Sequence, residues 1–104
     1  MKAYERLLSY VKIFTPSNEE STSSPSSRCQ FDLARLLVEE LKGLGISDVS
    51  LDEHCYVYAH LPATEGLEHC KALGFIAHMD TVSDFCDHAV TPVITENYDG
   101  KDLP

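Results

Sequence analysis

The spacing of hydrophobic residues changes along this chain, and the change fixes the order of its secondary-structure elements. In the first half, apolar residues recur at helical spacing and predict helices over residues 3–14 and 28–43. Apolar and polar residues then alternate in Val49–Leu51 and in Val57–Leu61, which is typical of half-buried strands. The order is therefore two helices followed by two strands, a pattern that favours an α/β fold.

The predicted helices have recognisable ends. Pro16 disfavours helical backbone at the residue before it and is expected to end the first helix. The polar, serine-rich stretch Ser17–Ser27 is expected to be an exposed loop between the helices. Its last serine and Gln30 fit the S-x-x-Q capping box, and Gly43 or Gly45 would close the second helix.

The strands are too few to complete a sheet. A turn near Glu53-His54 separates the first two strands, so they are expected to pair as a hairpin. Residues Ala72–Ala77 form a continuous apolar run, which suits a strand buried on both faces. Two other strands cannot cover it, so the chain is expected to be part of a longer α/β domain. The open sheet edges of such a piece favour self-association.

The apolar run ends at His78, and Asp80 follows two residues later. Ligand chemistry in open α/β sheets collects at the carboxyl ends of strands, and strand alternation would put both side chains on one side. A neutral imidazole is a good zinc ligand, and a carboxylate can hold its second nitrogen. The pair alone is a common pattern, and a strand-end histidine beside a turn-capping aspartate explains it more simply. One histidine also cannot hold zinc without further ligands.

The longer stretch IAHMDTVSDF, Ile76–Phe85, resembles the metal-site motif of the M20 family of zinc peptidases, and most of all its tripeptide aminopeptidases. The resemblance continues in Tyr4–Leu8 with Thr15–Ser17, in Tyr56–Thr64 and in Glu96–Leu103. It covers nearly the whole chain in order, so it is far more specific than the His-x-Asp pair.

The resemblance implies a phosphorylase/hydrolase-like α/β/α catalytic domain. Residues 1–104 would be its incomplete N-terminal part, two helices followed by a β-hairpin and a buried strand. It also implies that His78 is the first zinc ligand and that Asp80 is the catalytic-motif aspartate that orients this histidine. The other ligands of the two zinc ions, the general-base glutamate and the smaller second domain lie beyond Pro104 in the family pattern.

The implied reaction is the release of the N-terminal residue from tripeptides. Two zinc ions polarise the scissile carbonyl and lower the pKa of a bridging water, and a glutamate takes its proton. Because this chain lacks that glutamate and the bridging ligand, we expect the isolated chain to be inactive and at best a weak metal binder. The alternative is a non-catalytic truncated domain that acts only in association or has no independent function. The metal is left open, since related sites take zinc, cobalt or manganese.

Other polar side chains have weaker claims to a function. Three follow the motif, where a solvated acidic loop is the simpler interpretation: Asp84, Asp87 and His88. Cys86 could be metal-sensitive or oxidisable, but a packed or inert thiol is the simpler expectation. His54-Cys55 and His69-Cys70 could supply four zinc ligands, but adjacent side chains in a strand point to opposite sides.

The composition limits the partners and the compartment. The chain has 17 acidic residues (Asp and Glu) and 8 basic residues (Lys and Arg), which gives a net charge of -9. This charge argues against nucleic acid and anionic membranes as partners. No segment approaches the about 20 apolar residues of a membrane span, and the charged N-terminus is typical of an amphipathic helix rather than a signal peptide. The 4 cysteines form no C-x-x-C pair. Reduced thiols in a cytoplasmic protein are therefore the expected state.

Overall fold

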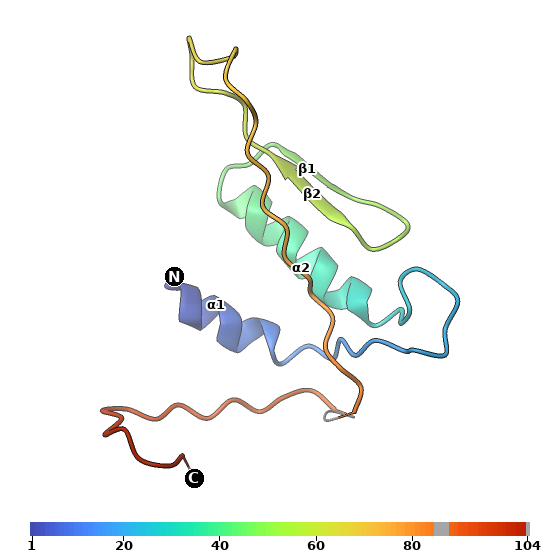
Figure 1. Cartoon of the computed structure of the whole chain (residues 1–104), viewed down its shortest axis with the longest axis vertical. Coiled ribbons are helices and arrows are strands. Elements are labelled where there is room, and N and C mark those ends of the chain that lie inside the picture. The colour runs from blue at the N-terminus through green and yellow to red at the C-terminus, as the bar shows by residue number, and fades with distance from the viewer. Residues whose placement is uncertain (85–87, 104) are drawn as a thin grey trace.

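The structure, a computed structural model of the whole chain, describes residues 1–84 and 88–103. Its elements follow the predicted order: α1 (Ala3–Tyr10), α2 (Gln30–Gly43), β1 (Asp48–Leu51) and β2 (Val57–His60). Figure 1 shows α2 at the centre, the two strands along one of its sides and α1 near its opposite side. The mixed helix and strand content confirms the α/β class of the prediction. Among the described residues, no helix is long and apolar enough to cross a membrane.

The two strands pair antiparallel, as the alternation of their side chains predicts. Val49 lies opposite Ala59 and Leu51 opposite Val57. The side chains of Val49, Leu51 and Val57 are half-buried, whereas their strand neighbours are exposed, and α2 contacts both strands. A core forms where α2 meets the hairpin, and its buried apolar members are Leu33, Ala34 and Cys55.

The hairpin turn spans the three residues between Asp52 and Tyr56. The amide of Cys55 donates to the carbonyl oxygen of Asp52 (3.2 Å), and the amide of Asp52 donates to that of Tyr56 (3.1 Å). Cys55 has a φ of 68°, in the left-handed region that a non-glycine residue rarely adopts. The side chain of Cys55 is buried, so the turn contributes to the core.

The prediction for α2 is confirmed at the C-terminal end of the helix and wrong at its N-terminal end. At the C-terminal end, the amide of Gly45 donates to the carbonyl of Lys42 (2.9 Å) and that of Ile46 to the carbonyl of Leu41 (3.2 Å). This is the Schellman cap, and the φ of 91° at Gly45 explains why glycine stands there. The predicted capping box at the other end is wrong. The helix begins later, and the side-chain amide of Gln30 is buried and donates to the carbonyl of Pro16 (3.4 Å) instead.

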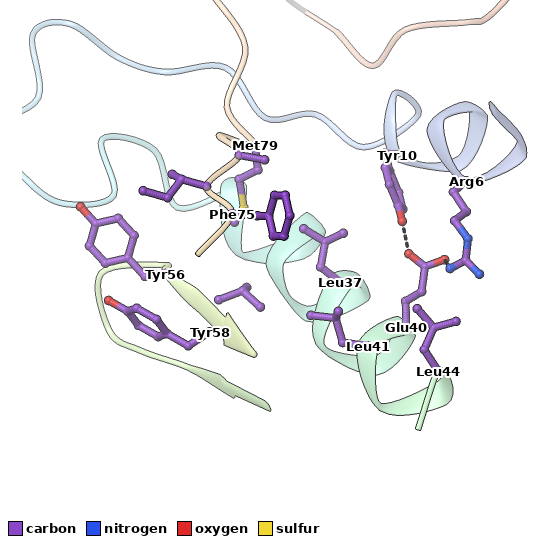
Figure 2. A pocket seen from close by; sticks show the side chains of 13 residues that line it. Arg6, Tyr10, Leu37, Glu40, Leu41, Leu44, Tyr56, Tyr58, Phe75 and Met79 are labelled. Carbon is purple, nitrogen blue, oxygen red and sulfur yellow. Dashed lines mark hydrogen bonds and ion pairs between the residues drawn. The ribbon is translucent and has the colours of Figure 1, made fainter. Parts of the chain in front are cut away.

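Helix α1 is shorter than the predicted residues 3–14. The amide of Ile13 donates to the carbonyl of Tyr10 in a turn, and the chain then enters the buried pair Thr15 and Pro16. Proline disfavours helical backbone only at the residue before it, and the bridge from Pro16 to Thr81 draws the chain out of the helix a turn earlier than its apolar spacing indicates. The carboxylate of Glu40 in α2 connects the two helices, because it pairs with the guanidinium of Arg6 and accepts a hydrogen bond from the hydroxyl of Tyr10 (Figure 2).

The predicted buried strand over Ala72–Ala77 is wrong for this chain. The segment is extended but unpaired, and the side chains of Phe75 and Ile76 are almost wholly exposed, at 92% and 101% of their full area. A strand buried on both faces needs a strand on each side, and within residues 1–84 and 88–103 the two strands pair only with each other. The radius of gyration, 17.2 Å, is accordingly larger than the about 13 Å of a compact domain of this length.

Candidate functional site

The side chains of His78 and Asp80 meet at the end of the extended segment. Nδ1 of His78 lies 3.1 Å from Oδ1 of Asp80 and 3.0 Å from its carbonyl oxygen. Both partners are acceptors, so Nδ1 carries the proton and donates it. Among the described residues, Nε2 of His78 has no hydrogen-bond partner, and the imidazole is 86% exposed. The geometry therefore presents the lone pair of Nε2 outward, with a carboxylate fixing the tautomer.

The residue after this pair is held by the loop that follows α1. The amide of Thr81 donates to the carbonyl of Thr15 (3.0 Å), and the amide of Ser17 donates to the carbonyl of Thr81 (2.8 Å). These bonds form a parallel bridge between Pro16 and Thr81. Because Thr15 and Pro16 are buried, the bridge anchors one end of the His78–Asp80 pair to the packed part of the molecule.

A cleft of about 330 Å³ lies beside the pair. Three segments line it: Ser24–Ser26 with Gln30, His54–Tyr56, and Ile76–Asp80. Gln30 organises its wall, since its side-chain amide reaches both the carbonyl of Pro16 and the hydroxyl of Ser26 at 3.4 Å. No sequence pattern marks these residues as the walls of one cleft. The S-x-x-Q pattern drew attention to Gln30, but only the fold reveals its part in the cleft.

The described residues fit a metal site in part. The free Nε2 of His78 has the chemistry of a zinc ligand, with its orienting carboxylate in place. However, residues 1–84 and 88–103 contain no group of three or more histidine, cysteine, aspartate or glutamate side chains that could hold a metal ion. Among the described residues, the site therefore offers one candidate ligand, His78, with a carboxylate beside it.

The weaker candidates form no metal site with the pair among the described residues, although His54 and Cys55 line the same cleft. Cys55 is buried in the hairpin turn, whereas His69 and Cys70 are exposed and only 3.9 Å from each other, so no four-ligand zinc site forms with His54. Burial raises the pKa of the Cys55 thiol, and the nearby Asp52 carboxylate adds to the effect. The side chains of Asp84 and His88 are exposed, and Cys86 and Asp87 lie outside the described residues.

Known proteins similar to this chain are peptidases, although no protein-family model matches it. The chain is 52% identical over 100 residues to peptidase T of Alkaliphilus oremlandii, which covers 95% of this chain and 24% of that protein. It is 49% identical over 102 residues to peptidase T of Bacillus licheniformis, covering 98% of this chain. It is 48% identical over 103 residues to peptidase T of Halothermothrix orenii, covering 98% of this chain and 25% of that protein.

Such similarity along nearly the whole chain confirms the predicted family resemblance, and the relatives that carry it are peptidase T proteins. The chain belongs to the peptidase T family. It spans about a quarter of the length of these relatives, 24% to 25% of each.

Proposed function

We propose that this chain supplies the His78–Asp80 part of the active site of a zinc-dependent aminopeptidase of the M20 family, which releases the N-terminal residue of tripeptides. The observation that carries the proposal is the bond between Nδ1 of His78 and Oδ1 of Asp80 (3.1 Å), which leaves Nε2 available. The similarity to peptidase T proteins supports the reaction class, and the resemblance to the M20 motif supports the metal. Zinc, cobalt and manganese can all bind an imidazole nitrogen of this kind. We propose zinc as the resident ion.

Each residue has a defined task in this proposal. His78 would hold a zinc ion through Nε2, and zinc, when bound, supplies the Lewis acid that polarises the scissile carbonyl. Asp80 keeps the proton of the imidazole on Nδ1 and stabilises the ring orientation, so that the lone pair of Nε2 faces the ion. The bridge between Pro16 and Thr81 holds the end of the motif in position. The general base and the other ligands would come from polypeptide that corresponds to the unmatched part of the peptidase T relatives.

Two consequences belong to the proposal. The isolated 104-residue chain is inactive, because the described residues provide no group of three metal ligands. The complete protein acts on small peptides in the cytoplasm, where the chain's 4 cysteines stay reduced.

The test joins this chain to the part of Alkaliphilus oremlandii peptidase T that the match does not cover, and follows tripeptide hydrolysis with and without a chelator. We expect metal-dependent release of the N-terminal residue. His78→Ala should lower kcat/KM by more than about 100-fold, and Asp80→Asn by about 10- to 100-fold. His60→Ala is the matched control, because His60 also pairs with an aspartate, Asp48, at 3.5 Å but lies in the hairpin. Equal activity of the His78→Ala and His60→Ala variants, or activity that resists the chelator, would contradict the proposal.

A further inference from the structure

Gln30 is a buried polar residue at the start of α2, with 7% of its surface exposed. Its side-chain nitrogen Nε2 donates to the carbonyl oxygen of Pro16 and to the hydroxyl of Ser26, both at 3.4 Å. Burying an amide costs free energy unless such partners satisfy it. Since an apolar side chain could be buried here without that cost, the presence of glutamine indicates that its hydrogen bonds matter.

One peptide group connects Gln30 to Thr81. The carbonyl of Pro16 and the amide of Ser17 belong to the same peptide group, which is planar and trans, so the two point in opposite directions. The carbonyl accepts from Gln30 (3.4 Å), and the amide donates to the carbonyl of Thr81 (2.8 Å). Figure 1 shows this place, where the loop after α1 meets the end of the extended segment. The bond from Gln30 therefore orients the group that holds Thr81.

A second peptide group connects Thr81 to the candidate zinc ligand. The amide of Thr81 and the carbonyl of Asp80 share this group. The amide donates to the carbonyl of Thr15 (3.0 Å), and the carbonyl accepts from Nδ1 of His78 (3.0 Å). The anchored amide thus fixes the position of one of the two acceptors of Nδ1, and the carboxylate of Asp80 is the other (3.1 Å).

Ser26 supports the same arrangement from the loop before α2. Its hydroxyl accepts from the backbone amide of Asn18 (3.0 Å) as well as from Gln30. The segment 16–18 is therefore held by Gln30 and Ser26, and it holds Thr81 in turn. Gln30 itself lies in the wall of the cleft that His78 and Asp80 also line.

We propose that Gln30 is a positioning residue for the His78–Asp80 pair. Through the two peptide groups it holds the carbonyl of Asp80, and thereby keeps the proton of the imidazole on Nδ1 and the lone pair on Nε2. The importance of Gln30 for catalysis rests on the proposed function, whereas its effect on the geometry of the pair does not.

Leu33 provides the control for a purely structural role of Gln30. It lies three residues later on α2 and is 6% exposed, so the two residues are buried alike. Its side chain belongs to the core between α2 and the hairpin, and it has no polar group that could bond to Pro16. Leu33→Ala therefore weakens the fold without removing a bond from the path that leads to His78.

The first experiment compares Gln30→Met with Leu33→Ala in the full 104-residue chain. Methionine keeps the length of glutamine and removes the donor. NMR at about pH 8, above the ordinary histidine pKa of about 6.5, records the ring-nitrogen chemical shifts of His78, which report the nitrogen that carries the proton. We expect Gln30→Met to move these shifts toward those of an imidazole that shares the proton between both nitrogens. Exchange of the amides of Ser17 and Thr81 should become about tenfold faster.

Leu33→Ala should leave the ring shifts of His78 unchanged, even where it speeds amide exchange by weakening the whole fold. Ser26→Ala is the second variant, because Ser26 lies outside α2 and its loss removes only one of the two acceptors of Gln30. It should move the ring shifts in the same direction as Gln30→Met, by a smaller amount.

The second experiment uses the chain joined to the unmatched part of Alkaliphilus oremlandii peptidase T. Gln30→Met should lower kcat for a tripeptide about tenfold and change KM by less than about twofold, because Gln30 acts through protein groups. A raised KM at unchanged kcat would place Gln30 against the peptide and would overturn the inference. An inactive joined protein would count against the proposed function alone, because the ring shifts of the 104-residue chain decide the positioning.

Two results of the first experiment would overturn the inference. One is that the ring shifts of His78 are unchanged in Gln30→Met while the α2 amides stay protected. The other is that Leu33→Ala moves these shifts as far as Gln30→Met does, which would identify Gln30 as a general stabiliser of the fold.

Discussion

Two regions of this molecule have similar proportions of apolar residues but bury them very differently. In residues 30–60, α2 and the hairpin cover each other, and Ala34 at their contact has no exposed area. In residues 72–81, an equally apolar extended segment lies open, with Ile76 fully exposed. The first region contains both packing partners, α2 and the hairpin, within thirty-one residues of chain. The second region has no packing partner of this kind among the described residues.

The difference teaches where the information for burial lies. The apolar spacing of a segment determines whether it forms a helix or a strand and which face it offers for packing. The partner for that face must come from elsewhere in the chain, and for α2 it follows almost immediately as β1. A central strand needs partners on both edges and both faces. Residues 72–77 therefore show their apolar pattern without reaching the buried state that the pattern predicts.

Truncating a core leucine should have the largest effect on the free energy of unfolding. Leu33→Ala removes a side chain that is 6% exposed, and we expect it to lower the free energy of unfolding by about 2–3 kcal/mol. Urea denaturation followed by circular dichroism of α2 gives the measurement. Leu73→Ala is the matched control in the open region, where the side chain is 79% exposed, and should leave the free energy nearly unchanged. Equal losses in the two variants would mean that the two regions are buried alike.

The cap of α2 provides the next largest effect. Gly45 has a φ of 91°, so Gly45→Ala should cost about 1 kcal/mol through backbone strain alone, because an added Cβ meets no atom within 4 Å. Gly43 lies inside the helix with the same open surroundings, and Gly43→Ala should stabilise α2 slightly through helix propensity. Thermal unfolding of both variants measures these stability changes, which we expect to have opposite signs. A destabilised Gly43→Ala variant would show that the end of α2 is not fixed by the Gly45 cap.

The buried thiol of Cys55 should have the smallest effect, which is on the pH dependence of stability. Burial raises the pKa of Cys55, so the unfolded chain ionises this thiol at a lower pH than the folded chain does. Its contribution is complete below the ordinary thiol pKa of about 8.5 and is lost as the pH rises through the higher pKa of the folded state. Urea unfolding at pH 7.5 and at pH 9.5 (about one unit to either side of that value) should therefore show a smaller loss of stability for Cys55→Ala than for the unmodified chain. Cys70 is exposed, so Cys70→Ala is the control and should follow the unmodified chain.

The sequence predicts the elements that depend on neighbours close in the chain. The spacing of Phe31, Ala34 and Leu41 predicts α2, and the alternation around Val49 and Val57 predicts the hairpin. Errors arise where a distant contact decides. Helix α1 ends early because Thr15 and Pro16 are drawn into the bridge with Thr81, more than sixty residues later. Gln30 is buried under Pro16 instead of capping its own helix for the same kind of reason.

The candidate site divides in the same manner. The two-residue spacing of His78 and Asp80 is local, and the structure brings their side chains together at 3.1 Å. Their roles as zinc ligand and orienting carboxylate stay a prediction. The cleft beside them is assembled from Ser24–Ser26 with Gln30 and from the hairpin turn, which lie far from the motif in the sequence. No spacing pattern links these segments, so only the folded chain identifies them as neighbours of the motif.

The most direct test of the contrast is amide hydrogen exchange of the isolated 104-residue chain, with residues 34–41 of α2 compared with residues 73–79. Our account predicts that the α2 amides exchange at least about 100-fold more slowly than the amides of the open segment, because only the former are hydrogen-bonded and packed. Comparable protection in both segments would contradict it, since residues 73–79 would then have found their partners within this chain.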